Sequence, residues 1–280
     1  MNNIAVFPNK ERDLGLCAAK EVVKLLRSCG KRVLIEKENY GMADGAEYME
    51  KEEILKIADL IVVLGGDGTI LRVVGDAAKH RIPIMGINLG HLGFLTQAER
   101  GDNSAFERLF AGEYSLSRNM MLEARLMKDG RVIEKYEALN DIILRGRSSK
   151  MVALETEVDG ILTNRYLADG MIAATATGST AYSLSSGGPI VHPELDCIIL
   201  TPICPHTLKA RCIVVPPEKT VTMRIDGEYR TEVQLKADGC SVHIMEDGEY
   251  IEIRRSAERA LLVNLDGRNY FDVIREKLAD

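Results

Sequence analysis

The first hundred residues alternate short apolar runs with amphipathic segments. Two β-branched runs, Ile4–Phe7 and Arg32–Glu36, have the length and composition of strands. Between them, apolar residues recur at intervals of three and four over Arg12–Cys29, which predicts a helix that ends at Gly30. This alternation is typical of a parallel sheet covered by helices.

The next two predicted strands lead directly into glycine-containing loops. A helical segment, Glu50–Ala58, precedes the continuous apolar run Leu60–Leu64, which predicts a strand buried on both faces. The loop Gly65–Thr69 and a further helical pattern follow it. The run Ile82–Ile87 predicts another buried strand, and it ends in the loop Asn88–Leu95. Ligands of open α/β sheets bind at the carboxyl ends of strands, so these loops mark the candidate site.

From about Tyr114 the pattern becomes that of a β-rich domain, with strand-length runs joined by Asp-Gly turns. The predicted strands are Leu122–Met127, Val132–Tyr136, Asp141–Leu144, Val152–Val158, Cys197–Leu200, Arg211–Val215, Val221–Ile225, Thr231–Leu235, Ser241–Met245 and Tyr250–Ile253. The turns begin at Asp129, Asp159, Asp226, Asp238 and Asp247.

Helical spacing returns in the last segment, at Tyr270, Phe271, Ile274 and Leu278. We therefore expect an α/β domain with a parallel sheet over residues 1–115 and a mostly β domain over residues 116–265. The C-terminal helix, within residues 266–280, is expected to pack back on the first domain.

Composition narrows the class of protein. The chain has 280 residues, 46% of them hydrophobic, with 36 Lys and Arg against 42 Asp and Glu and a formal net charge of -6. A chain with this net charge lacks the broad positive field of nucleic-acid-binding proteins, so we expect no nucleic-acid partner. A site for anions would need backbone N–H groups, helix N-termini, a few placed cations or a metal ion. No stretch approaches eighteen uncharged apolar residues, and the first residues do not have the pattern of a signal peptide. We expect a cytoplasmic protein without a membrane partner, whose six cysteines are reduced.

The loop Gly65-Gly66-Asp67-Gly68-Thr69 has the properties of a phosphate-binding turn. Its glycines let the backbone approach a phosphate, whose charge would face the N–H groups at a helix N-terminus. Glycines alone would fit a tight strand-to-helix connection equally well. A carboxylate among anion-binding amides, however, suggests a chemical role for Asp67. The fingerprint G-x-G-x-x-G fails because position 71 is Leu71, and no G-x-x-x-x-G-K-[ST] loop occurs.

This loop, followed by the Ser, Thr and Gly-rich block Asp169–Pro189, resembles the NAD kinases, within a superfamily that includes phosphofructokinases and diacylglycerol kinases. The block Asp169–Pro189 resembles the substrate-binding segment of NAD kinases almost throughout. The pair Asn140-Asp141 and the segment Thr201–Arg211 correspond to further family segments, so the resemblance spans roughly residues 60 to 255. It implies the two-domain fold of that superfamily.

The resemblance also implies the NAD-binding residues. Asn140 and Asp141 would hold NAD through its polar edges and ribose hydroxyls, and Asp169 would accept hydrogen bonds from the nicotinamide amide. The pocket itself would be lined by Thr180, Ala181, Tyr182, Ser183, Leu184 and Ser185.

Two further positions differ from the usual family residue, and a third has two interpretations. Asp141 stands where the family usually has glutamate, so its side chain is shorter by one methylene. Cys240 stands where the family often has glutamine. Lys150 aligns with a family position near the substrate, although a solvated loop lysine is an equally good interpretation.

We therefore expect a kinase that uses ATP and a divalent metal ion, Mg²⁺, to phosphorylate the 2′-hydroxyl of the adenosine ribose of NAD. Asp67 is the expected general base, and the donor phosphates are assigned to Gly66, Gly68 and Thr69, with Arg72 in the same nucleotide-binding set. No metal ligand is assigned to the protein.

The Gly-rich loops and the β domain are expected to share one cleft. The resemblance further implies a homo-oligomer, a dimer or a tetramer. Two alternatives stay open: a lipid or sugar kinase of the same superfamily, and a non-catalytic sensor of NAD or NADP.

Overall fold

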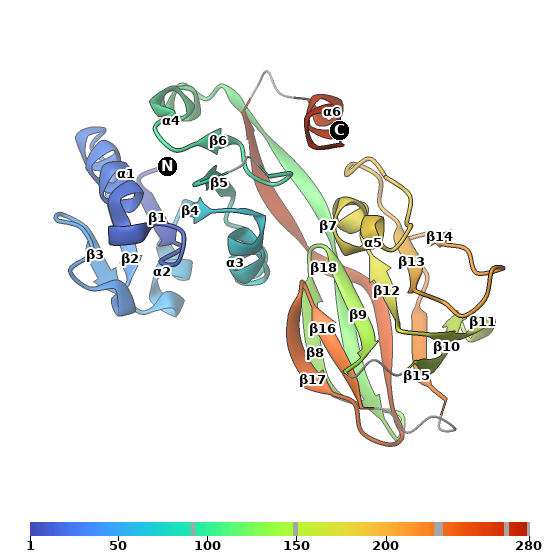
Figure 1. Cartoon of the computed structure of the whole chain (residues 1–280). Coiled ribbons are helices and arrows are strands. Elements are labelled where there is room, and N and C mark those ends of the chain that lie inside the picture. The colour runs from blue at the N-terminus through green and yellow to red at the C-terminus, as the bar shows by residue number, and fades with distance from the viewer. Residues whose placement is uncertain (91–92, 148–150, 227–231, 266–268, 279–280) are drawn as a thin grey trace. The chain divides into compact units, whose positions relative to one another are not determined.

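The computed structural model describes residues 1–90, 93–147, 151–226, 232–265 and 269–278 (Figure 1). The chain divides into two compact units, one of residues 1–118 with 260–280 and the other of residues 119–259. Two long strands, β7 (Tyr114–Lys128) and β18 (Glu249–Leu265), contain residues of both units.

The first unit is an α/β fold, as predicted. Its elements are β1 (Asn3–Pro8), the 3-10 helix η1 (Leu14–Leu16), α1 (Cys17–Ser28), β2 (Arg32–Glu36), the 3-10 helix η2 (Lys37–Asn39), β3 (Glu47–Met49), α2 (Lys51–Ile57), β4 (Leu60–Gly65), α3 (Asp67–Lys79), β5 (Ile84–Asn88), β6 (Ala98–Glu99), α4 (Asn103–Ala111) and α6 (Tyr270–Leu278).

The sheet of this unit is parallel and has the order β3-β2-β1-β4-β5. Every residue of β4 is buried, which explains its continuous apolar sequence. Helix α1 contacts β1 and β2, whereas α3 contacts β4 and β5. The chain runs outward from β1 to β3 and then returns to β4 on the other side of β1, so the topological switch point lies between β1 and β4.

The first helix begins later than the prediction of Arg12. Gly15 and Leu16 have left-handed φ values of 71° and 55°, which interrupt any helix at this point. The buried carboxylate of Asp13 instead accepts hydrogen bonds from the backbone N–H groups of Ala18 and Ala19, at 3.0 and 2.9 Å. Leu14, predicted on the apolar helix face, is 81% exposed. The predicted end is confirmed, with Gly30 at φ 71°.

The second unit is almost entirely β. Apart from β7 and β18, it contains β8 (Arg131–Ala138), β9 (Asp141–Gly146), β10 (Val152–Val158), β11 (Ile161–Ala168), β12 (Gly170–Ala174), the 3-10 helix η3 (Thr177–Thr180), α5 (Tyr182–Ser185), β13 (Ile198–Ile203), β14 (Ile213–Val215), β15 (Val221–Ile225), β16 (Val233–Ala237) and β17 (Cys240–Ile244).

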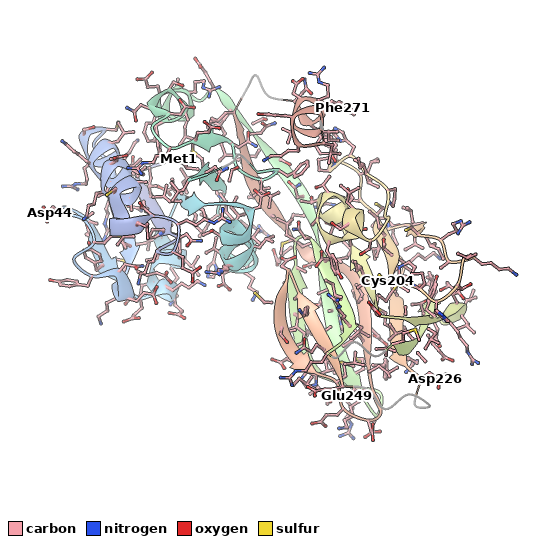
Figure 2. All side chains as sticks on the ribbon, in the orientation of Figure 1. Met1, Asp44, Cys204, Asp226, Glu249 and Phe271 are labelled. Atoms are coloured by element: carbon pink, nitrogen blue, oxygen red, sulfur yellow. The ribbon has the colours of Figure 1, made fainter. Side chains whose placement is uncertain are left out.

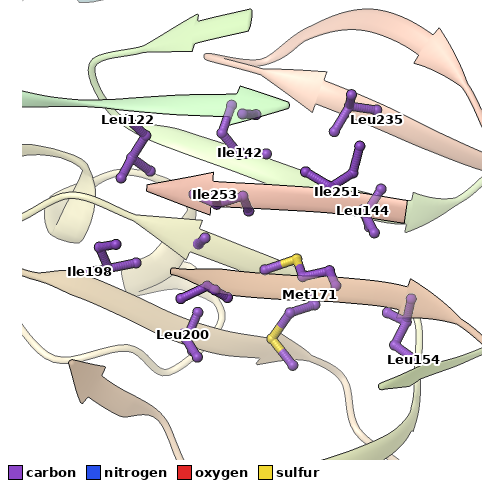
Figure 3. Close-up of a cluster of buried hydrophobic side chains, with 14 of the residues drawn as sticks. Leu122, Ile142, Leu144, Leu154, Met171, Ile198, Leu200, Leu235, Ile251 and Ile253 are labelled. Atoms are coloured by element: carbon purple, nitrogen blue, oxygen red, sulfur yellow. The ribbon is translucent and has the colours of Figure 1, made fainter. Parts of the chain in front are cut away.

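Two antiparallel sheets enclose the core of this unit. One sheet has the order β14-β13-β12-β9-β16-β17, and the other contains β11, β10, β15 and β18 together with β7 and β8. Leu144 and Met171 from the first sheet form one buried cluster with Leu122, Leu154 and Ile251 from the second (Figure 3). Leu154 and Ile251 alternate with more exposed residues along β10 and the first part of β18, whereas Leu144 and Met171 lie in continuously buried stretches of β9 and β12.

The predicted Asp-Gly turns are confirmed where both residues are described. Asp129, Asp159 and Asp238 have φ values of 49°, 51° and 47°, and the glycine after each also has a positive φ. Two consecutive positive φ values define the type I′ hairpin turn. At Asp226 the following glycine lies outside the described residues.

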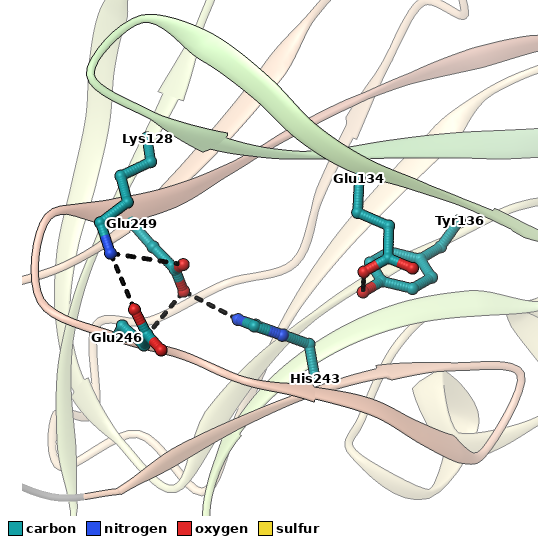
Figure 4. A network of polar contacts seen from close by, with 6 residues as sticks. All are labelled: Lys128, Glu134, Tyr136, His243, Glu246 and Glu249. Atoms are coloured by element: carbon teal, nitrogen blue, oxygen red, sulfur yellow. Dashed lines mark hydrogen bonds and ion pairs between the residues drawn. The ribbon is translucent and has the colours of Figure 1, made fainter.

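A polar network fixes the turn between β17 and β18 (Figure 4). The buried Glu249 carboxylate accepts a hydrogen bond from Glu246 N at 2.8 Å and lies 2.8 Å from His243 Nε2. Lys128 at the end of β7 pairs with the Glu246 carboxylate at 2.7 Å. Because each buried charge in this network has a partner, we regard the network as structural.

The predicted C-terminal helix is confirmed as α6, in which Phe271 is 64% exposed (Figure 2). The expectation that it packs back on the first domain stays a prediction. Among the described helices, none combines the length and the apolar character needed to span a bilayer.

Candidate active site

The carboxyl ends of β1 and β4 meet at the switch point of the parallel sheet. Asn9, directly after β1, donates its backbone N–H to Leu64 O at 2.8 Å, and its side-chain Nδ2 donates to Thr69 Oγ1 at 2.9 Å. A Cβ atom on Gly65 would lie 2.3 Å from that same Thr69 hydroxyl oxygen. The loop therefore needs glycine at position 65, because Thr69 packs directly against its backbone.

Helix α3 directs its N-terminus to this edge. Gly66 is the N-cap residue and Asp67 is the first residue of a helix of 13 residues. The first N–H groups of any α-helix have no partner within the helix, and together with the helix dipole they favour an anion. Gly66 and Gly68 add no side chain that would keep a phosphate away from this backbone.

The Asp67 carboxylate is held by the loop that follows β5. Its Oδ2 accepts a hydrogen bond from Phe94 N at 2.8 Å, and its Oδ1 accepts one from Leu95 N at 3.1 Å. A Cβ atom on Gly93 would lie only 2.0 Å from Asp67 Oδ1. The two glycine-containing loops are thus in contact, as their position after neighbouring strands predicted. An ionised carboxylate has about four acceptor sites, so two donors leave it able to accept another proton or hydrogen bond.

Arg12 is a cation at this edge that the sequence analysis missed. A Cβ atom on Gly66 would lie 2.9 Å from Arg12 Nη1, so the guanidinium group lies against the glycine that begins α3. Asn9 Oδ1 accepts hydrogen bonds from Glu11 N and Arg12 N, which fixes the turn that carries Arg12. Within the described ranges, no carboxylate forms an ion pair with Arg12. In the sequence, the position of Arg12 shortly after the first predicted strand could have indicated that it lies at this edge.

In the second unit, hydrogen bonds on both sides fix the backbone around Asn140 and Asp141. The Asp238 carboxylate accepts the N–H groups of Leu139, Asn140 and Asp141, at 2.8, 2.7 and 3.1 Å. Thr175 satisfies the carbonyl groups: its Oγ1 donates to Leu139 O at 2.6 Å, and its N–H donates to Asn140 O at 2.9 Å.

The Asp141 carboxyl is buried, with 4% of the residue exposed. Burial raises the pKa of Asp141 to about 7, and the negative charge of Asp238 contributes to the same shift. Burial also raises the pKa of Asp238, although the three N–H donors oppose this change. No hydrogen bond from a described residue reaches the Asp141 carboxyl, so it is available to a ligand.

The predicted pocket-lining segment Thr180–Ser185 forms the end of η3 and the short helix α5. The Arg145 guanidinium lies over the Tyr182 ring, 5.9 Å from its centroid. Ser183 is fully buried, and its hydroxyl lies 2.9 Å from Thr201 Oγ1. The Ser183 hydroxyl therefore has a partner within the fold, and its predicted part in NAD binding stays a prediction.

Comparisons with known proteins give the family. A model of the ATP-NAD kinase N-terminal domain matches residues 5–114, and a model of the ATP-NAD kinase C-terminal domain matches residues 139–265. The chain belongs to the ATP-NAD kinase family. It is 40% identical to the NAD kinase of Symbiobacterium thermophilum, over 100% of this chain and 99% of that one. It is 39% identical to the NAD kinase of Caldanaerobacter subterraneus subsp. tengcongensis, over the full length of both chains.

Solved structures of related kinases have the same fold. The structure of yeast NADH kinase in complex with NADH matches with a TM-score of 0.88 and 26% identity, covering 99% of this chain and 87% of that one. An NAD kinase from Archaeoglobus fulgidus in complex with ATP matches with a TM-score of 0.75 and 27% identity, covering 98% of each chain. The family resemblance and the fold class predicted from the sequence are confirmed.

The remaining predicted residues of this ATP-NAD kinase family member lie on other elements of the two units. Asp169 lies between β11 and β12 and is partly buried, Arg72 is exposed on α3, and Cys240 is exposed at the start of β17. Lys150 lies outside the described residues. The roles of all these residues stay predictions.

Proposed function

We propose that this chain transfers the terminal phosphoryl group of ATP to the 2′-hydroxyl of the adenosine ribose of NAD, giving NADP, ADP and a proton. Family membership supports the reaction. The observation that carries the chemistry is the Asp67 carboxylate, which the amides of Phe94 and Leu95 hold in place at the N-terminus of α3.

Asp67 acts as the general base. It accepts the proton of the 2′-hydroxyl as that oxygen forms a bond to the terminal phosphorus, while the bond from phosphorus to the bridging oxygen of ADP breaks. The proton then passes from Asp67 to solvent. Two backbone donors restrict rotation of the carboxylate, so the acceptor oxygen is oriented before the substrate binds.

The N-terminus of α3 binds the donor phosphates. Gly66 and Gly68 allow close approach to the backbone, and Thr69 supports the loop through its hydrogen bond with Asn9. Arg12 supplies positive charge beside Gly66, where it can bind a phosphate oxygen. Arg72 stays in the predicted nucleotide-binding set.

A divalent metal ion fits this arrangement if ATP supplies most of its ligands. In the part of the chain that the structure describes, no three His, Cys, Asp or Glu side chains are grouped to hold a metal. Mg²⁺ in nucleotide sites is usually bound by phosphates, waters and one or two carboxylates, and Asp67 is a carboxylate beside a phosphate-binding loop. When bound, Mg²⁺ neutralises charge on the donor phosphates.

The second unit binds NAD. Asn140 and Asp141 have fixed backbones and free side-chain acceptors, which suits recognition of ribose hydroxyls. Asp169 and the segment Thr180–Ser185 complete the proposed NAD-binding set. We also propose a cytoplasmic homo-oligomer, as the family resemblance implies.

A comparison of acceptors tests the proposed function. The purified chain is incubated with ATP, Mg²⁺ and one acceptor: NAD, diacylglycerol or a sugar phosphate. We expect ADP release when the acceptor is NAD and none with the other two acceptors. Turnover with the lipid or the sugar, but not with NAD, would favour a different kinase of the superfamily. Binding of NAD without any turnover would identify a sensor.

A further inference from the structure

Among the Asp-Gly turns that join strands, the turn at Asp238 differs in where its carboxylate lies. Asp129 is exposed, and the Asp159 carboxylate binds Lys219 Nζ and Thr220 N near the surface. The Asp238 carboxylate instead accepts three consecutive backbone N–H groups, from Leu139 to Asp141. A type I′ turn requires only a residue that tolerates a positive φ, such as Asp or Asn. The three hydrogen bonds of the Asp238 carboxylate are therefore not needed for the turn itself.

Those hydrogen bonds end at the residues proposed to bind NAD. Asp238 N also donates to Asp141 O at 3.0 Å, and β16 pairs with β9 up to the partners Ala237 and Ile142. Thr175 binds the carbonyl groups of Leu139 and Asn140 from the neighbouring strand. The short segment before β9 thus has its donors and its acceptors satisfied by two different elements.

Gly178 closes the same segment from a third direction. A Cβ atom there would lie 2.0 Å from Asn140 O, so the η3 backbone is packed directly on the Asn140 carbonyl. The Asn140 and Asp141 side chains therefore project from a rigid backbone, and a rigid backbone lowers the entropy cost of binding a ligand.

Asp238 also acts on the charge of Asp141. Both carboxyl groups are withdrawn from water, and among the described charged groups Asp238 is the one that shifts the titration of Asp141. A protonated carboxyl can donate a hydrogen bond, whereas an ionised carboxylate can only accept. The charge of Asp238 therefore affects whether Asp141 donates a hydrogen bond to a ribose hydroxyl or accepts one from it.

We propose that Asp238 is a positioning residue for NAD binding, which fixes the Asn140-Asp141 backbone through three hydrogen bonds and places a negative charge close to Asp141. The proposal rests on the proposed function and assigns to Asp238 a role that it performs without touching the substrate. In this account the ionised Asp141 binds the ribose, so NAD affinity rises as Asp141 loses its proton.

The test compares the full-length chain with Asp238→Asn. Asparagine keeps the type I′ turn but removes the charge and places an amide N–H₂ group among N–H donors. We expect the KM for NAD to rise about tenfold, as for the loss of hydrogen bonds to a charged group, while the KM for ATP changes less than about threefold. The pH midpoint of NAD affinity, near 7 in the unaltered chain, is expected to move to lower pH.

Asp129→Asn is the matched control, because it makes the same change in an exposed turn of the same type. Unchanged NAD affinity and pH midpoint in a folded Asp238→Asn variant would overturn the proposal. If that variant does not fold, Asp141→Asn decides: the pH step in NAD affinity must disappear, and its persistence contradicts the proposal. Calorimetric titration of the unaltered chain with NAD distinguishes failure of the Asp238 proposal from failure of the proposed function. If the unaltered chain does not bind NAD, the proposed function itself is refuted.

Discussion

Gly93→Ala is a steric test of the position of Asp67. The new Cβ would lie 2.0 Å from Asp67 Oδ1, 2.5 Å from its Cγ and 2.6 Å from its Oδ2. Ordinary contacts of this kind are well above 3 Å, so the carboxylate or the loop has to move by about 1 Å. A misplacement of about 1 Å in a catalytic group can reduce the rate about 10²-fold. We therefore expect kcat to fall about 100-fold.

The assay follows NADP formation with an NADP-dependent dehydrogenase in excess. The KM for NAD is expected to change little, because the residues proposed to bind NAD lie in the second unit. Gly90→Ala is the control in the same loop, since a Cβ atom at Gly90 would meet nothing within 4 Å.

The reasoning is refuted if Gly93→Ala folds with normal thermal stability and keeps kcat within about threefold of the unaltered chain. It is also refuted if Gly90→Ala loses activity to the same degree, because the effect would then come from the loop in general.

Three further changes address separate parts of the account. Asp67→Asn should lower kcat by about 10²–10⁴-fold, the usual contribution of a general base, with NAD affinity unchanged in calorimetric titration. Arg12→Ala should raise the KM for ATP about tenfold and leave the KM for NAD unaltered, as steady-state kinetics will show. Because its pKa is raised to about 7 in the folded state, Asp141 holds a proton that the unfolded chain releases near pH 4, so stability falls as the pH rises from about 4 to about 7. Asp141→Asn should remove this loss, on the order of a few kcal/mol, in urea unfolding curves recorded at pH 5 and pH 8.

Local patterns determined most of the first domain. The strand Arg32–Glu36 was predicted with the bounds that the structure has, because a short β-branched run between a helix-ending glycine and a polar stretch has few alternatives. The contact between the two glycine-containing loops could be predicted because the carboxyl ends of neighbouring parallel strands lie at the same edge of a sheet. The position of Asp67 at this edge of the sheet could therefore be predicted from the sequence, while its catalytic role stays a prediction.

Long-range contacts explain what the sequence did not reveal. The strand predicted over Tyr250–Ile253 runs from Glu249 to Leu265, because partners on other elements satisfy its polar middle section. One of those partners is Asp196, which forms ion pairs with Arg259 and Arg255 of that strand. No periodicity within the strand could have revealed this.

The same limit applies to the site. Arg12 and Asp238 are ordinary polar residues in their local sequence, one after a strand and the other in a turn. Their contacts with Gly66 and with the segment before β9 join residues that are far apart in the chain. Only the folded backbone brings these groups together.

The most direct measurement identifies the product of the reaction with NAD. The purified chain is incubated with ATP, Mg²⁺ and NAD, and the product is examined by phosphorus NMR and by reduction with a dehydrogenase specific for NADP. The account predicts one new phosphomonoester at the 2′ position of the adenosine ribose, formed in equal amount to ADP and about 10²–10⁴-fold more slowly with Asp67→Asn. ADP without any phosphorylated dinucleotide, or phosphate at another position of NAD, would contradict it.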